Sequence, residues 1–252
     1  ILGRDVDGVR IGMARGITTA MLGKVVDDSG HGSSDMLLNG LLWAAGSGAQ
    51  IACLSVAFDT VGLSELLVEQ GYPLLLAASI AVDSHRSNLR LIETFAAMLQ
   101  APDSGQGGPL IIAAAGNESR RQVAPDFEVG VSAPASAKGV LSVGALGQGE
   151  GGLIIAPFSN TAPTIAAPGV GIVSATSDGG LRTLNGTAQA AAHVAGAAAL
   201  WSEALSAQAP APASAIRAAL LATAQHSGLA PPASPFDLGR GLVQVPPRRS
   251  PP

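Results

Sequence analysis

The alternation of short apolar runs with segments of helical periodicity constrains the fold of this chain more than any other feature of its sequence. The apolar runs have the length of buried strands, and the segments between them repeat their apolar residues at helical spacing. Such alternation is typical of a parallel sheet with helices on both faces, so we predict an α/β fold. We expect strands over residues 20–26, 49–55, 110–115 and 140–145, and helices over residues 35–45, 63–70, 87–99, 188–205 and 214–224.

Composition argues against several kinds of partner. Charged residues make up 13% of the chain, and no stripe of basic residues is interleaved with aromatic ones, so we do not expect nucleic-acid binding. Every apolar run is broken before the roughly 18 residues that a membrane span requires. The single cysteine, Cys53, has no partner for an internal disulfide or a cysteine-based metal site, and its apolar neighbours predict a buried, unreactive thiol.

The first segment that carries chemistry is Ala-Ala-Ala-Gly-Asn-Glu at residues 113–118. A buried strand ends there in Gly116 and Asn117, at the carboxyl end of a strand, where open α/β sheets bind ligands. The side-chain amide of Asn117 is a suitable donor for an oxyanion hole. The alternative interpretation is an asparagine that only forms the turn after the glycine.

The second segment begins with Gly186 and Thr187 and continues into a helix of small residues that ends near Trp201. Small residues let a ligand approach the helix N-terminus closely, and they also let the helix pack tightly against a sheet. Considered alone, this segment indicates a buried, alanine-rich helix.

Together, in this order, the two segments resemble the subtilase family of subtilisin-like serine proteases (peptidase S8). The family's serine block reads Gly-Thr-Ser-Met-Ala-x-Pro-His-Val-Ala-Gly, and residues 186–196 read Gly-Thr-Ala-Gln-Ala-Ala-Ala-His-Val-Ala-Gly. The family's Ala-Ala-Ala-Gly-Asn block is intact at residues 113–117. Further matches are Phe-Ser-Asn at 158–160, Ala-Pro-Gly at 167–169, and the stretches at 12–16 and 23–25. The resemblance covers about residues 3–205 and implies a three-layer α/β/α subtilisin-like fold with a mainly parallel central sheet.

The resemblance also implies roles for individual residues. Asn117 would be the oxyanion donor, and Ala188 occupies the position of the nucleophilic serine. The substrate would be an extended peptide or protein that pairs with the chain as an added strand. Gly30, His31 and Gly32 would pair with it, Ser55, Val56 and Ala57 would form the opposite wall, and Ala113, Ala114, Ala115 and Gly116 would line the S1 pocket.

The sequence departs from the family where catalysis occurs. Alanine has no oxygen for nucleophilic attack, so Ala188 cannot form an acyl-enzyme. In the family the Asp and His blocks precede the stretch found here at 12–16, so we expect both to lie before Ile1, in a chain that is N-terminally truncated. His31 follows the stretch at 23–25 and is not the catalytic histidine. His193 belongs to the serine block as a structural residue. Gln189 and Ala192 replace the family's Met and Pro, which indicates drift rather than a single engineered change.

We expect no cofactor and no metal site. Members of the family often bind structural calcium, but the sequence offers no acidic cluster for it, and the pair Asp5 and Asp7 is too small. No export signal precedes Ile1, so localisation stays open, with an extracellular location suggested by the family alone.

We assign residues 1–230 to a peptidase-like domain, with a helical insertion over about residues 59–108, and residues 231–252 to a proline-rich tail expected to be extended or disordered. The insertion is either a surface addition or a wall of the cleft that meets a partner. Our leading hypothesis is an inactive family member that retains a peptide-binding cleft. The alternatives are a protease with a substitute nucleophile, for which Thr187 is a candidate, and a non-enzymatic subunit whose protein partner supplies the Asp and His segment.

Overall fold

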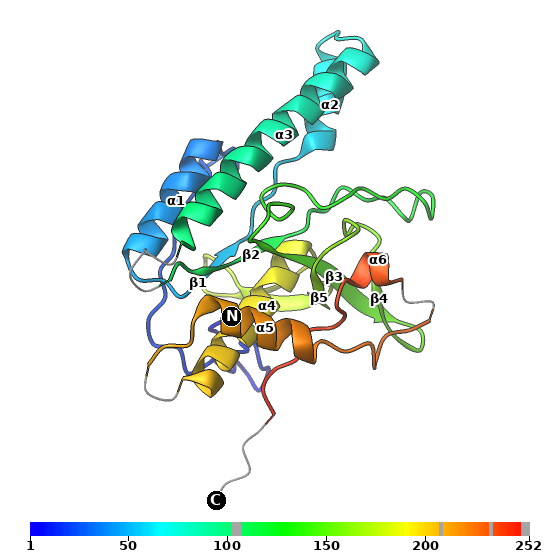
Figure 1. The fold of residues 1–252 in the computed structure, drawn as a ribbon. Helices are drawn as coiled ribbons and strands as arrows, with labels where there is room; N and C mark the ends of the chain where they lie inside the picture. Colours follow the sequence, from blue (N-terminus) through cyan, green and yellow to red (C-terminus); the bar gives the residue numbers. More distant parts are fainter. Residues whose placement is uncertain (102–106, 207–208, 232–233, 248–252) are drawn as a thin grey trace, which may run out of the picture.

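The computed structural model describes residues 1–101, 107–206, 209–231 and 234–247 and contains a central five-stranded sheet (Figure 1). Strands β1, β2 and β3 lie side by side, and β3 also pairs with β4 and β5. Every pairing is parallel except that of β3 with β4, which form a hairpin. The strands are β1 (Ile51–Leu54), β2 (Leu110–Ala114), β3 (Leu141–Gly149), β4 (Gly152–Ile155) and β5 (Ile165–Pro168).

Helices cover both faces of this sheet and complete the predicted three layers. On one face, α1 (Ser34–Gly46) and α3 (Leu74–Leu99) bury side chains such as Leu41 and Ile92 against β1 and β2. On the other face, α4 (Thr187–Leu205) and α5 (Ala213–Thr223) pack against β2, β3 and β5. The α/β class, the mainly parallel sheet and the three-layer arrangement are confirmed.

Small residues position α4 directly beneath the sheet. Ala190, Ala191 and Ala198 are fully buried, because their short side chains let the helix approach the strands closely. On another side of the helix the N-terminal segment crosses α4 at Gly196. A Cβ added to Gly196 would lie 2.8 Å from the Cβ of Met13, so only glycine leaves room for this crossing.

The insertion forms a helical hairpin that projects away from the sheet (Figure 1). Its first helix, α2 (Thr60–Glu69), begins after Asp59, whose carboxylate accepts a hydrogen bond of 2.7 Å from the N–H of Gly62. The second helix, α3, begins at Leu74, earlier than the predicted residue 87. Its first turns read Leu-Leu-Leu-Ala-Ala-Ser-Ile-Ala-Val, and such an unbroken apolar run has no helical period that sequence reasoning can detect.

The strand predicted over residues 20–26 is absent, and this prediction was wrong. A strand needs a neighbour for its backbone, and β1, at the edge of the sheet, pairs only with β2 among the described residues. The segment instead packs its side chains on α1, where Val25 lies so close to Gly40 that an added Cβ would be 2.6 Å from it. The short strands β5, β6 (Ile172–Ala175) and β7 (Leu181–Leu184) were not predicted, because four residues give too little periodicity.

The chain beyond residue 231 differs from the extended tail that we expected. A short helix, α6 (Pro235–Leu238), buries Leu238, and the chain then buries Val243. The indole N–H of Trp201 donates a 3.0 Å hydrogen bond to the carbonyl of Gln244. Proline is frequent here, but the few apolar residues between the prolines supply the burial that fixes the segment. Residues 232–233 and 248–252 lie outside the described part of the chain.

Candidate active site

The turn that carries Asn117 is determined by the glycine before it. Gly116 follows β2 with a φ of +108°, a conformation that residues with side chains rarely adopt. An added Cβ would lie 2.4 Å from both Asn160 Nδ2 and Glu118 Oε2. The chain can therefore turn sharply at the carboxyl end of the strand and place the side chain of Asn117 at the surface.

A buried asparagine that sequence reasoning did not single out holds this turn in place. Asn160 is fully buried, and its Oδ1 accepts hydrogen bonds from the N–H groups of Glu118 (3.0 Å) and Ser119 (3.1 Å). Its Nδ2 donates to the carboxylate of Glu118 and to the carbonyl of Gly130. The Phe-Ser-Asn motif was noted in the sequence, but nothing local in it reveals a partner some forty residues away.

Three hydrogen bonds join the Asn117 turn to the start of α4. The N–H and the hydroxyl of Thr187 donate to Asn117 Oδ1 at 2.9 and 3.0 Å. The Thr187 hydroxyl also accepts a 3.1 Å bond from the N–H of Gly116. These bonds bring together the two segments that the sequence analysis identified, so Asn117 and Ala188 lie at one site.

The chemistry that this site offers is the binding of a partly negative oxygen. The amide nitrogen of Asn117 forms no hydrogen bond to any described residue, and it sits beside the first turn of α4. The first N–H groups of a helix have no intrahelical acceptor, and they carry the positive end of the helix dipole. A carbonyl or carboxylate oxygen placed here would find suitable donors.

The first two residues of α4 present no accessible hydroxyl beside these donors. Ala188 is half-buried and ends in a methyl group that packs against the core below. The neighbouring hydroxyl of Thr187 is completely buried and is occupied by Asn117 and Gly116. A nucleophile must be reached by the substrate and must give its proton to a base, and this hydroxyl has neither property.

His193 is a structural residue of α4. Its Nδ1 lies 3.0 Å from the carbonyl of Gln189, one turn earlier, and must carry the proton in that hydrogen bond. Burial lowers the pKa of His193, which is the direction expected when a cation is taken out of water. The assignment of this histidine to packing agrees with these contacts.

His31 lies in an exposed turn with Asp27 and Ser29, and its Nδ1 is 3.2 Å from the Ser29 hydroxyl. The carboxylate of Asp27 accepts hydrogen bonds from the hydroxyl of Ser29 (2.8 Å) and from the N–H of His31 (2.9 Å). The backbone bond from His31 is the main cause that lowers the pKa of Asp27. In a triad the carboxylate orients the imidazole ring, whereas here it bonds the serine and the backbone, so the bonds stabilise the turn.

The residues predicted to form the substrate cleft divide into two groups. Ser55, Val56 and Ala57 follow β1 and are at least partly exposed, and Gly116 follows the neighbouring β2, so these positions meet at one edge of the sheet. Ala113, Ala114 and Ala115 are buried in the core of the sheet. Gly30, His31 and Gly32 lie on the exposed turn before α1, and no hydrogen bond between described residues joins them to Asn117 or Ala188. The cleft remains a prediction.

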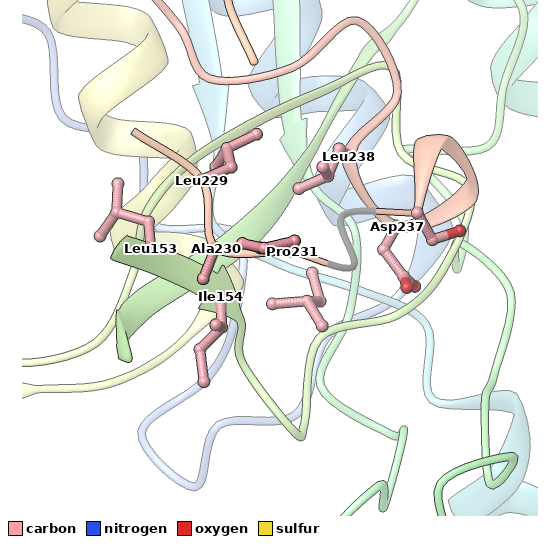
Figure 2. Close-up of a pocket in the computed structure, with 9 residues that line it drawn as sticks. Leu153, Ile154, Leu229, Ala230, Pro231, Asp237 and Leu238 are labelled. Atoms are coloured by element: carbon pink, nitrogen blue, oxygen red, sulfur yellow. The ribbon is translucent and has the colours of Figure 1, made fainter. Parts of the chain in front are cut away.

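A small apolar hollow lies elsewhere, between β4, the segment that follows α5, and α6 (Figure 2). It has a volume of about 110 Å³, and its walls are mostly aliphatic side chains such as Leu153 and Leu229. Its one carboxylate, Asp237, already accepts a 2.6 Å hydrogen bond from Arg121 and a 3.1 Å bond from Thr161. Oδ1 of Asp237 is therefore already occupied, and the hollow shares no residue with the Asn117 site.

The described residues contain no group of three or more His, Cys, Asp or Glu side chains that could hold a metal ion. Within the same part of the chain, no helix combines the length and the apolar character needed to cross a membrane.

Comparison with known proteins identifies the family. The model of the subtilase family (peptidase S8) matches residues 3–241. A subtilisin-like protease of Coccidioides posadasii is 34% identical over 70% of this chain and 36% of its own length. A cuticle-degrading serine protease of Arthrobotrys oligospora is 31% identical over 71% of this chain and 35% of its own length. The chain thus spans about a third of the length of the curated relatives that it matches.

Solved structures agree with this identification. The prenylagaramide maturation protease PagA has a TM-score of 0.54 at 25% identity and is matched over 87% of this chain and 68% of its own. A lanthipeptide protease has a TM-score of 0.58 over 88% of this chain and 66% of its own, and at 19% identity this likeness concerns the fold alone. The family model and the relatives, together with the joined Asn117 and serine-block segments, show that the chain belongs to the subtilase family.

Proposed function

We propose that this chain is a subtilase-family domain that binds extended peptides at the Asn117 site and does not cleave them. The observation that carries the proposal is the alanine at position 188, at the start of α4, beside the hydrogen-bonded pair Asn117 and Thr187. The donors for a carbonyl oxygen are in place, and the atom that would attack the carbonyl carbon is missing.

Acyl transfer by this family needs a serine oxygen, a histidine base and an oxyanion hole. Loss of the nucleophile alone removes the covalent step, although oxyanion donors can still bind a carbonyl group. A partner that supplied Asp and His would leave Ala188 unchanged, so complementation by a second chain does not restore cleavage. Such a partner would add binding surface, and the proposal therefore favours binding over catalysis.

The alternative of a substitute nucleophile is disfavoured by the burial of Thr187. Its hydroxyl would have to leave Asn117 and Gly116, so two of the three hydrogen bonds that connect the turn to α4 would break. Rotation of the Thr187 hydroxyl toward a substrate would remove a hydrogen bond that holds Asn117, and oxyanion donors stabilise the transition state only when they are held in place.

The class of ligand follows from the donors and from the relatives. An N–H donor set at a helix N-terminus suits a carbonyl or a carboxylate oxygen, and both occur in peptides. The relatives are named as proteases, and PagA is named for the maturation of prenylagaramide. We therefore propose an extended peptide as the ligand, held by strand pairing near Ser55, Val56 and Ala57.

Two measurements on the full chain test the proposal. A fluorophosphonate probe should not label the chain, with an active subtilisin-like protease as the positive control. A fluorescein-labelled library of randomised octapeptides should be retained on the immobilised chain, and Asn117→Ala should weaken retention by about five- to tenfold. The matched control is Asn39→Ala, which removes an exposed asparagine on α1 and should leave retention unchanged.

Either of two results would contradict the proposal. Labelling of any serine or threonine near Asn117 would show a working nucleophile and restore the enzymatic interpretation. Equal retention of octapeptides by the Asn117→Ala and Asn39→Ala variants would show that the Asn117 site does not hold the ligand.

A further inference from the structure

The end of the α2–α3 hairpin exposes an unusual amount of apolar surface. We define the leucine tip as Leu66, Tyr72, Leu74, Leu75 and Leu76. Leu75 is 85% exposed and Leu74 is 67% exposed, although soluble chains rarely gather large aliphatic side chains in one exposed patch. The tip lies at the far end of the projecting hairpin, away from both core clusters of the sheet (Figure 1).

The helix α2 lacks the burial that a stable helix of its length needs. None of its ten residues is buried, and its main packing partner is α3. Isolated helices shorter than about 12–15 residues are marginal in water, and most helical stability in proteins comes from packing of an apolar face. A third helix laid along the hairpin would bury the exposed leucines and complete a small bundle.

The charges near the leucine tip indicate what kind of partner could bind there. Residues 59–83 contain Asp59, Glu65, Glu69 and Asp83 and no lysine or arginine. Further along α3, Arg86 and Arg90 carry positive charge, and Arg86 lies 3.8 Å from Asp83. Glu65 is paired with Arg120 at 3.1 Å, whereas no ion pair between described residues involves Glu69, which lies next to the leucine tip. An acidic, leucine-rich surface repels a second copy of itself and an anionic membrane, and it attracts a segment that combines apolar and basic side chains.

We infer that the leucine tip is a docking surface for a basic amphipathic helix of another polypeptide. The helix would place its apolar stripe on Leu74 and Leu75 and a lysine or arginine near Glu69, as amphipathic helices do when they bind apolar surfaces. This inference does not depend on the proposed peptide binding at Asn117, because the tip shares no residue with that site.

The test uses the full chain and a fluorescein-labelled 18-residue peptide of leucine and lysine, patterned as an amphipathic helix, read by fluorescence anisotropy. A peptide of the same composition in scrambled order separates helical recognition from simple charge attraction. The patterned peptide should bind at least tenfold more tightly than the scrambled one.

Two pairs of variants locate the binding. Leu74→Gln combined with Leu75→Gln should weaken binding of the patterned peptide at least tenfold. The control pair, Leu22→Gln with Phe236→Gln, removes apolar side chains that are 92% and 72% exposed elsewhere and should change binding less than twofold. All four residues are exposed, so the variants should fold, which circular dichroism checks.

A charge variant gives the second readout. Glu69→Gln should weaken binding about twofold at low salt and less at high salt. The control, Glu150→Gln, removes an exposed carboxylate outside the hairpin and should have no effect.

Several results would overturn the inference. One is equal binding of the patterned peptide to the wild-type chain and to the Leu74→Gln, Leu75→Gln variant. A second is a dimer in sedimentation analysis that this variant dissociates, which would assign the tip to a second copy. A third is flotation of the wild-type chain with phosphatidylcholine vesicles that the same variant abolishes, which would assign the tip to a membrane.

Discussion

The Asn117 site and the α2–α3 hairpin are built in opposite ways. At the site, every element is fixed by several contacts, since Asn160 alone bonds three segments and Thr187 connects a strand to a helix. In the hairpin, α2 has no buried residue and the tip projects into solvent. The comparison teaches that the geometry of the site does not depend on the residue at position 188, because the surrounding bonds also hold the core together. The α2 helix of the hairpin buries no residue in the core, so packing against the core does not explain why the leucines at its end are apolar.

The largest expected difference between the two regions concerns glycine. Gly116→Ala should destabilise the chain by about 3 kcal/mol or more, because a positive φ and a Cβ 2.4 Å from Asn160 Nδ2 are both unfavourable. In the hairpin, Gly71→Ala has a positive φ but nothing within 4 Å of the added Cβ, and should cost about 1 kcal/mol. Urea denaturation of both variants measures the difference, and equal losses would mean that the two turns are equally constrained.

The next effect concerns the buried amide. Asn160→Ala should cost about 2–3 kcal/mol, because the N–H groups of Glu118 and Ser119 and the carbonyl of Gly130 lose their partner inside the protein. The hairpin counterpart is Leu75→Ser, an exposed position where the change should stay within about 0.5 kcal/mol. Urea denaturation midpoints of the two variants measure these losses. An Asn160→Ala variant with the stability of the wild-type chain would show that the network does not position the turn.

Ion pairs provide a third comparison. Arg121 and Asp237 are only 10% and 14% exposed, and Asp237→Ala should cost about 1–3 kcal/mol, since Arg121 keeps Glu128 as a second partner. Arg120 and Glu65 at the hairpin are 45% and 56% exposed, so Glu65→Gln should cost less than about 1 kcal/mol. Thermal unfolding at 0.05 and 0.5 M salt measures both, and only the hairpin pair should depend strongly on salt.

The smallest effect is a dependence on pH that arises in the body of the protein. Burial lowers the pKa of His193 below its ordinary value, so the unfolded chain binds a proton more readily than the folded chain. The stability that His193 contributes is present above the unfolded pKa of about 6.5 and is lost as the pH falls toward the folded pKa. His193→Gln should reduce this loss between pH 7.5 and 5, whereas the control His226→Gln on an exposed loop should not. Identical slopes in both variants would remove His193 as the cause.

Sequence reasoning located the centre of the site and much of the core. Strands β1, β2 and β3 have apolar runs that predict buried strands. Asn117 and Ala188 lie in motifs that are typical of the family. A common site for these two residues is what the family resemblance implies, and hydrogen bonds from Thr187 to Asn117 join the two segments.

The incorrect predictions have a common physical origin. In each case the structure of the segment depends on residues that are far away in the sequence. Residues 20–26 have the composition of a strand but no neighbouring strand, and the start of α3 has an apolar surface on all sides without a period. Asn160 acts through groups far away in the sequence, and the tail near Val243 packs because apolar residues find the core. The cleft residues around His31 stay a prediction, because no contact between described residues joins them to Asn117.

The crossing of Met13 over Gly196 has a consequence for biosynthesis. The contact joins positions that lie 183 residues apart, so the N-terminal segment cannot dock until α4 has been made. At roughly 5–20 residues per second, about ten to forty seconds pass between synthesis of the two partners. During that time the apolar residues of the emerging chain lack their final cover, so chaperones have an interval in which to act before the domain closes.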